Sequence, residues 1–152
     1  MPNLDDTLRE IDDHTKLVIS AGGPGSGRHT LFNKVRDAFL KDFENHGSDN
    51  PEAEDINGGD CANYAAVMYQ KLDGKAKILS TKASGGHVFL KVGTKYFDAT
   101  HTKGVSKIGD LDADYKSFPE SRFDDLSFDE LCKSWKVSKS YLKRIHKMSS
   151  DT

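Results

Sequence analysis

Hydrophobic residues recur with a helical period in four parts of the chain. The first part covers 31–43. The second begins after Asp60, a favourable N-cap residue, and ends near Gly74, which suits the left-handed conformation that terminates helices. A capping-box pattern opens a third helix over 127–135, and a basic segment over 138–148 predicts the last. The strand signals lie between the second helix and the third.

Strands are predicted where short apolar runs are bounded by turn residues. The run over 76–81 is one strand. The runs over 87–92 and 95–99 form a hairpin, because only Gly93-Thr94 separates them. The polar segment 46–59 is interpreted as a loop. Helices packed on a small antiparallel sheet place the chain in the α+β class.

The two ends of the chain differ from its middle. Residues 1–29 are predicted to be an acidic N-terminal arm followed by a glycine-rich linker, with five glycines or prolines among the eight residues from 22 to 29. At 152 residues the chain is long enough for one domain with a proper core and too short for two. We therefore expect one domain over 30–148, with a tail over 149–152.

Composition narrows the classes of function. The 22 basic and 24 acidic residues are interspersed and give a formal net charge of −2, so a nucleic-acid partner is not expected. No run approaches the roughly 18 apolar residues of a spanning helix, and the N-terminus lacks a signal-like segment. Two cysteines make no disulfide scaffold, so we expect reduced thiols and a cytoplasmic protein with no membrane partner.

Three residues in the middle of the chain carry candidate chemistry. Cys61 stands at a predicted helix start, His87 opens one hairpin strand, and Asp98 lies on the returning strand. A two-residue turn at 93–94 makes His87 and Asp98 diagonal neighbours on one face, about 7–8 Å apart at the backbone and within reach of a hydrogen bond. A register slip of one residue would move Asp98 to the opposite face.

These residue types in this order are the parts of a thiol-based acyl-transfer site. A free thiol, with a pKa of about 8.5, is mostly protonated at neutral pH, and a helix N-terminus and an imidazolium both stabilise the thiolate. His87 would activate Cys61, and Asp98 would fix the imidazole tautomer. Asp60 opposes the thiolate unless helix amides hold its carboxylate, as we expect. Backbone amides of the same helix start, and the side chain of Asn57, are candidate oxyanion donors.

The Gly-Asp-Cys61 helix start, the Gly-Gly-His87-Val-Phe-Leu strand and the Tyr-Phe-Asp98 strand resemble the papain-like and transglutaminase-like cysteine enzymes, including the small NlpC/P60 type. The resemblance covers 57–100. It implies a papain-like core, with Cys61 as nucleophile, His87 as base and Asp98 as orienting group. It also implies a cofactor-free thiol hydrolase or acyl-transferase that forms a thioester with a protein or peptide substrate. Asp55 stands where papain-type enzymes carry their oxyanion glutamine.

A non-enzymatic interpretation stands beside this one. Cysteine is often buried for packing alone, and a histidine or an aspartate in a strand is ordinary. The glycine-rich string over 22–28 resembles linkers of tailed-phage head and virion-associated proteins. The chain is then a virion or assembly protein that keeps the fold without the chemistry, with its arm docked on a larger viral assembly. Either interpretation allows a virion-associated location.

A nucleotide-binding protein is the third alternative. The phosphate-loop pattern G-x-x-x-x-G-K-[ST] is met at Gly22 and Gly27. Arg28 replaces its lysine, and His29 displaces the hydroxyl by one place, to Thr30. A linker is the preferred interpretation of this segment.

The remaining candidates favour structural roles. His29 and His101 have no second ligand at zinc-like spacing, so we expect exposed polar histidines and no metal site. Cys132 lies beside Leu131 and Trp135 in a predicted helix, which indicates a core position. The basic residues of the last helix are interpreted as a solvated face.

Overall fold

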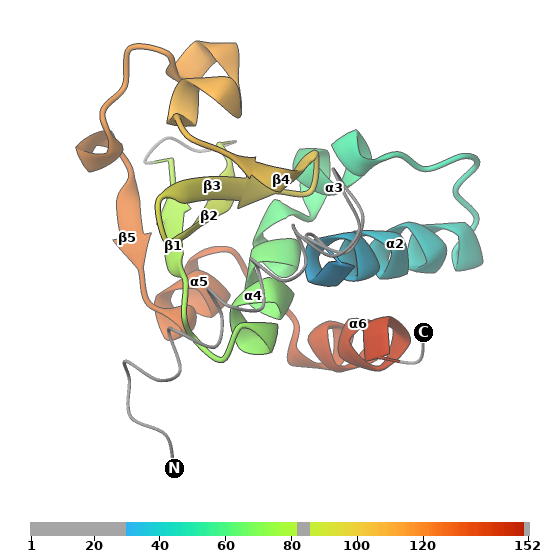
Figure 1. Ribbon diagram of the computed structural model, residues 1–152. Helices are drawn as coiled ribbons and strands as arrows, with labels where there is room; N and C mark the ends of the chain where they lie inside the picture. The colour runs from blue at the N-terminus through green and yellow to red at the C-terminus, as the bar shows by residue number, and fades with distance from the viewer. Residues whose placement is uncertain (1–29, 82–85, 151–152) are drawn as a thin grey trace.

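The computed structural model describes residues 30–81 and 86–150. The predicted arm and linker of residues 1–29, with His29 and most of the phosphate-loop pattern, lie outside these residues. The described chain is an α+β fold (Figure 1). Its elements are α2 (Thr30–Asn45), α3 (Ala53–Gly59), α4 (Cys61–Lys71), β1 (Lys77–Ser80), β2 (Val88–Val92), β3 (Lys95–Asp98), β4 (His101–Val105), η1 (Ile108–Asp110), η2 (Ala113–Tyr115), η3 (Glu120–Arg122), β5 (Asp124–Leu126), α5 (Phe128–Ser134) and α6 (Lys139–Ser150).

The five strands form one antiparallel sheet in the order β4-β3-β2-β1-β5. The hairpin of β2 and β3 has the predicted register, with Val92 opposite Lys95 and Leu90 opposite Phe97. Gly93 takes a positive φ of 62° in the two-residue turn, where other residues would be strained. This register places residues 87 and 98 on the same face of the sheet.

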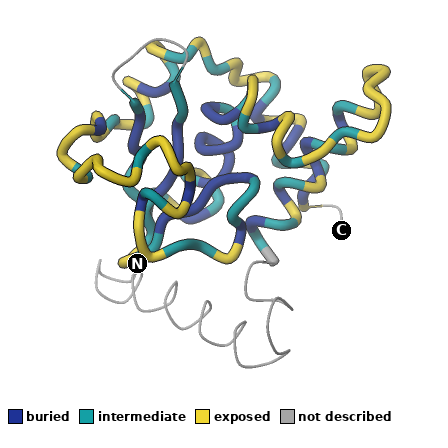
Figure 2. Tube along the Cα trace, turned by 90° about the horizontal axis from the view of Figure 1, so that it is seen from above, coloured by how far each residue is buried: buried dark blue, intermediate teal, exposed yellow. Residues whose placement is uncertain are grey.

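Successive residues of the inner strands pack on opposite faces. On one face, Ile78, Val88 and Phe97 join the larger core cluster, which includes α4 and the buried sides of α2 and α6. On the other face, Leu79 and Phe89 join a smaller cluster that includes residues between β4 and β5. Figure 1 shows the helices on one side of the sheet and the 106–123 segment on the other. Buried residues concentrate between these layers (Figure 2).

The predicted helices are confirmed in α2, α4, α5 and α6. Asp73 and Gly74 end α4 in the left-handed region. The Ser127–Glu130 capping box opens α5. Helix α6 continues to Ser150, two residues into the segment assigned to the tail. The core position predicted for Cys132 is wrong, because this residue is only partly buried and lies outside both clusters.

Helix α3 occupies a segment that the sequence predicted as loop. A single apolar side chain, Ile56, anchors this helix and is completely buried. Asp55 caps it, because its carboxylate accepts the N–H of Glu52 at 2.8 Å. A single buried apolar residue gives no helical period, so the polar composition of 46–59 predicted a loop where the structure has a helix. The same holds for edge strands β4 and β5, whose polar sequences are typical of sheet edges.

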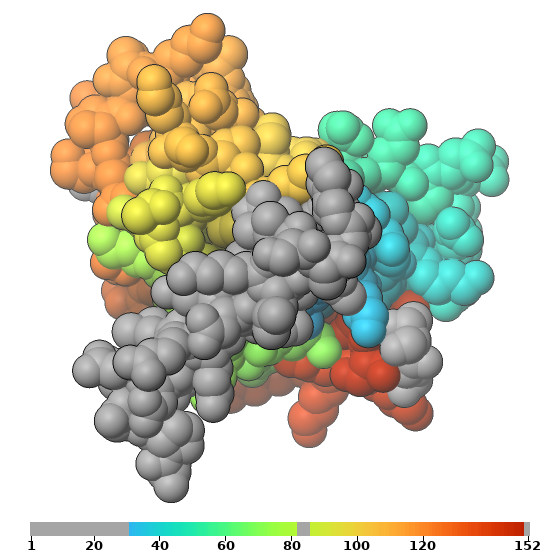
Figure 3. Space-filling model, in the orientation of Figure 1, coloured from blue at the N-terminus to red at the C-terminus, as the bar shows by residue number. Residues whose placement is uncertain are grey.

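The 106–123 segment forms a lobe at one corner of the molecule (Figure 3). Glu120, near the C-terminal end of this segment, connects the lobe to the sheet. Its carboxylate accepts hydrogen bonds from Lys77, Lys91 and Tyr96 at 2.8 to 3.1 Å. These hydrogen bonds lower the pKa of Glu120 to about 2. The carboxylate is therefore ionised at neutral pH, and the lobe is held against the face of the sheet that carries His87 and Asp98.

Candidate active site

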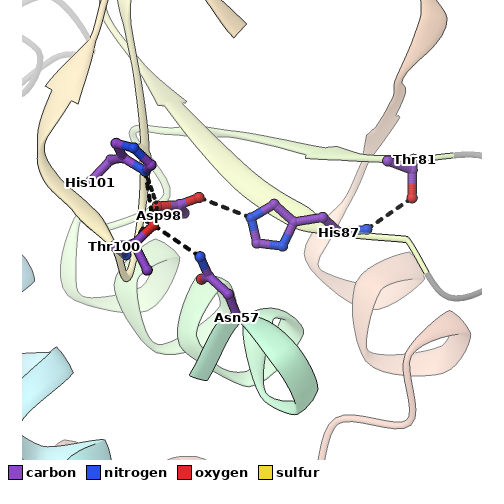
Figure 4. Close-up of polar contacts among 6 residues, drawn as sticks. All are labelled: Asn57, Thr81, His87, Asp98, Thr100 and His101. Carbon is purple, nitrogen blue, oxygen red and sulfur yellow. Dashed lines mark hydrogen bonds and ion pairs between the residues drawn. The ribbon is translucent and has the colours of Figure 1, made fainter. Parts of the chain in front are cut away.

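His87 and Asp98 meet at the end of the β2–β3 hairpin. His87 directly precedes β2, and its backbone N–H donates to Thr81 Oγ1 at 2.9 Å. Its ring packs against Phe89, with centroids 6.0 Å apart. Nε2 lies 3.0 Å from Oδ2 of Asp98, the last residue of β3 (Figure 4). The hydrogen bond predicted from the hairpin register is therefore present.

The second oxygen of Asp98 is held by the turn that follows β3. Oδ1 accepts the Thr100 backbone N–H at 3.0 Å and the Thr100 hydroxyl at 2.9 Å. It also lies 2.9 Å from Nδ1 of His101. The sequence did not predict this set, and the expectation of an exposed polar His101 is wrong. In the sequence, Asp98 followed two residues later by Thr100 suits an Asx-turn, and from this spacing part of the network could have been predicted.

Cys61 is the first residue of α4 and belongs to the helix-side core. Only 7% of its surface is exposed. Ala65, Met68 and Leu72 are buried with it, as their spacing predicted. Cys61 lies near enough to His87 to contribute, after Asp98, to the raised pKa of the ring. Because Asp98 holds Nε2, the ring nitrogen left for the sulfur is Nδ1.

Asp60 does not cap α4, contrary to expectation. Its side chain makes no capping hydrogen bond and instead accepts from Asn63 Nδ2 at 2.7 Å. Burial raises the pKa of Asp60, against the opposing effect of the Asn63 hydrogen bond. A raised pKa favours the neutral carboxyl group, so Asp60 opposes a thiolate at Cys61 less than a carboxylate with the ordinary pKa would. The first-turn amides of α4 are not used by this carboxylate.

Asn57 lies on α3 and lines a cavity of about 390 Å³ together with His87 and Asp98. Its Nδ2 donates to Thr100 Oγ1 at 3.1 Å, which links α3 to the Asp98 network (Figure 4). Thr100 gives its own hydroxyl proton to Asp98, so Asn57 must present its N–H₂ there. The candidate oxyanion donor is thus at the site, with one of its hydrogens engaged. Cys61 is not among the residues that line this cavity.

The charges of the site depend on one another. Burial alone would lower the pKa of His87, but Asp98 and Cys61 outweigh it and raise this pKa to about 9. Burial alone would raise the pKa of Asp98, yet His87 and His101 hold it below the ordinary value. At neutral pH the pair is therefore an imidazolium and a carboxylate, and the imidazolium is the form that stabilises a thiolate.

The free energy of unfolding is expected to decrease between about pH 6.5 and 9, by up to about 3 kcal/mol. The folded state raises the pKa of His87 from 6.5 to about 9, so its stabilisation is complete below 6.5 and lost as pH rises through 9. The lowered pKa of Asp98 adds stability above 3.8, which is lost in acid. Urea denaturation at about pH 3, 6 and 9.5 measures both, the first against the second for Asp98 and the third against the second for His87. If the free energy of unfolding of a His87→Ala variant decreases equally between pH 6.5 and 9, His87 is not the group responsible for the decrease.

Within 30–81 and 86–150, no three His, Cys, Asp or Glu side chains form a group that suits a metal ion. No described helix combines the length and apolar character needed to cross a bilayer.

Comparisons with protein-family models, with curated proteins and with solved structures found no match for this chain.

Proposed function

We propose that the protein is a thiol-dependent amide hydrolase or acyl-transferase with a papain-like core and Cys61, His87 and Asp98 as its catalytic residues. The observation that carries this proposal is the His87 ring, which is bonded to Asp98 through Nε2 and influenced by Cys61. These three residues come from separated parts of the sequence, and their types are those of a nucleophile, a base and an orienting carboxylate.

The proposed reaction has two stages. The Cys61 thiolate attacks the amide carbonyl, and the His87 imidazolium gives its proton to the departing amine, which leaves a thioester. Water, or the amine of an acceptor, then attacks the thioester carbonyl and gives its proton to His87. The acyl–sulfur bond breaks, which returns Cys61 as the thiolate beside the His87 imidazolium. Transfer to water is hydrolysis, and transfer to an amine is crosslinking. Both use the same residues.

The negative oxygen of the tetrahedral intermediate requires hydrogen-bond donors. The amides of the first turn of α4 are suited to this, since Asp60 makes no capping bond with them. Asn57 is the second candidate, through the hydrogen of Nδ2 that Thr100 does not use. No glutamine is needed at the position of Asp55, which instead caps α3.

Acylation by a small activated ester tests the proposal without knowledge of the substrate. Incubation with 4-nitrophenyl acetate is expected to add one acetyl group to Cys61 and to release nitrophenol in a burst followed by slow turnover. Mass spectrometry of the digested protein locates the acetyl group. Acetylation only at Cys132 or at lysines would contradict a nucleophilic Cys61.

His101 is expected to act as a positioning residue, because it fixes the orientation of the Asp98 carboxylate. His101→Asn retains a side-chain N–H donor, and His101→Phe removes it. We expect kcat for deacylation of the acetyl-enzyme to fall about tenfold in the Phe variant and to be largely retained in the Asn variant. A purely packing role predicts the reverse order, because Phe fills the space better. Acetyl-enzyme decay followed by mass spectrometry gives both rates.

The burial of Cys61 favours a second candidate. With 7% of its surface exposed and no place in the cavity wall, the thiol is compatible with a packing role. The protein would then be a virion or assembly component that keeps the fold without the chemistry. A Cys61 that no small ester or alkylating agent reaches in the folded protein would support this candidate.

A further inference from the structure

Thr100 lies behind the wall of the candidate active site. Asn57, His87 and Asp98 line the cavity of about 390 Å³, whereas Thr100 is not among its lining residues. Thr100 occupies the turn between β3 and β4, two residues after Asp98. Its hydroxyl is bonded to both Asn57 and Asp98 (Figure 4). A part played by Thr100 in the reaction is therefore exerted through these neighbours.

The directions of these hydrogen bonds follow from the charge of Asp98. An ionised carboxylate only accepts, so the Thr100 hydroxyl gives its single hydrogen to Oδ1 of Asp98 at 2.9 Å. His101 Nδ1 lies 2.9 Å from the same oxygen and donates to it, since an unprotonated nitrogen would face a negative charge. The Thr100 oxygen has no hydrogen left and still has lone pairs. It accepts a hydrogen from Asn57 Nδ2 at 3.1 Å.

This last hydrogen bond determines which way the Asn57 amide points. If the amide were reversed, its carbonyl oxygen would face a Thr100 oxygen that has no hydrogen to donate. Asn57 Oδ1 has no hydrogen-bond partner within 30–81 and 86–150, so the bond to Thr100 is what holds the side chain in one orientation. Because the amide group is planar, fixing one Nδ2 hydrogen also fixes the direction of the other.

Helix α3 alone gives Asn57 little support. This helix has seven residues, and its one buried residue is Ile56. The bond from Asn57 to Thr100 joins α3 to the turn after β3, 43 residues further along the chain. That turn is itself held by Asp98, which accepts the Thr100 backbone N–H at 3.0 Å. Thr100 therefore carries the geometry of the hairpin over to Asn57, and an oxyanion donor is effective only when its position is fixed in advance.

We propose that Thr100 is a positioning residue for acyl transfer, which aims the free Nδ2 hydrogen of Asn57 at the oxyanion. This inference rests on the proposed function for the reaction and for Asn57 as a donor. When the Thr100 hydroxyl is removed, Asp98 keeps its bonds to His87, to His101 and to the Thr100 backbone. The effect of Thr100 is thus expected on the tetrahedral intermediate and not on the thiolate.

Two substitutions at residue 100 and two reactions of Cys61 test this inference. Thr100→Val has nearly the same shape without the hydroxyl, and Thr100→Ser keeps the hydroxyl. Acetylation by 4-nitrophenyl acetate passes through an oxyanion, whereas alkylation by iodoacetamide does not. We expect Thr100→Val to slow acetylation of Cys61 about tenfold and to leave its alkylation rate within about twofold of the wild type. Thr100→Ser is expected to retain both rates.

An Asn57→Ala variant identifies the residue through which Thr100 acts. We expect it to slow acetylation about 100-fold, and adding Thr100→Val is expected to cause no further loss. Thr102→Val is the matched control, because it removes a buried threonine hydroxyl from the neighbouring strand β4, and we expect it to react like the wild type. Urea denaturation shows whether each variant is folded. Thr100→Ala, which also lacks the hydroxyl, gives the same test if the valine variant does not fold.

Three results would overturn the inference. The first is a wild-type rate of acetylation in Thr100→Val or in Asn57→Ala. The second is a further loss when the two substitutions are combined, and the third is alkylation that falls as much as acetylation. Failure of the proposed function is recognised separately, by a wild-type Cys61 that 4-nitrophenyl acetate does not acetylate.

Discussion

Replacing Cys61 with alanine is expected to abolish acyl transfer, with a loss in kcat on the order of 10⁴-fold or more. Without the sulfur no thioester forms, and His87 and Asp98 have no nucleophile to activate. Release of 4-nitrophenol from 4-nitrophenyl acetate is the measurement. In the Cys61→Ala variant its rate is expected to fall to that of the protein-free reaction.

Cys132→Ala is the matched control, because it removes the other thiol from a partly buried position on α5. We expect this variant to react like the wild type. Turnover that persists in Cys61→Ala and disappears in Cys132→Ala would reassign the nucleophile. Because Cys61 is buried, circular dichroism and a urea titration must show that the alanine variant remains folded.

Replacing Asp98 with asparagine is expected to lower kcat by about 10³- to 10⁴-fold. The amide oxygen of asparagine can still accept the hydrogen bonds of Thr100 and His101. Its N–H₂ then faces His87 Nε2 and donates to it. The ring proton is forced onto Nδ1, the nitrogen left for Cys61, so the ring cannot accept the thiol proton.

The loss in Asp98→Asn must be separated from a loss of stability. Asp98 is only 3% exposed and is hydrogen-bonded through both oxygens. Asp42→Asn is a suitable control, because Asp42 is also a buried carboxylate, with a cationic partner on α6. We expect both variants to be destabilised, by roughly 1–3 kcal/mol, and only Asp98→Asn to lose activity. Equal losses of activity in the two folded variants would remove Asp98 from the proposed mechanism.

The part of the site that could be predicted from sequence is the part that local geometry determines. A two-residue turn fixes the register of a hairpin, and the register fixes which side chains share a face. His87 and Asp98 therefore form the hydrogen bond that a two-residue turn at 93–94 predicts. Cys61 was placed at a helix start because the residues after it follow a helical period.

The parts that could not be predicted depend on contacts between distant segments. Helix α3 is fixed by the burial of one residue, Ile56, which no periodic pattern announces. Edge strands β4 and β5 are polar and take their strand conformation from their neighbours. Asp60 pairs with Asn63 and not with the helix amides, although both arrangements suit the sequence.

The acidic residues that line the cavity beside His87 and Asp98 could not be predicted from local sequence patterns either. Glu54 lies in the segment interpreted as loop, and Asp112 and Asp114 lie in a polar stretch without a strand or helix pattern. Their proximity depends on how the lobe packs on the sheet, which Glu120 helps to determine through Lys77 and Lys91. Charges that appear evenly mixed along a sequence can still gather in space.

The rate at which iodoacetamide alkylates Cys61, measured by mass spectrometry across about pH 5 to 9, tests the central claim most directly. Cys132 in the same molecule serves as the internal reference. If His87 holds a proton beside the sulfur, Cys61 reacts at least about tenfold faster than Cys132 at pH 6, and His87→Ala abolishes this difference. Alkylation of Cys61 that is no faster than that of Cys132, or that is unchanged in His87→Ala, would contradict the claim.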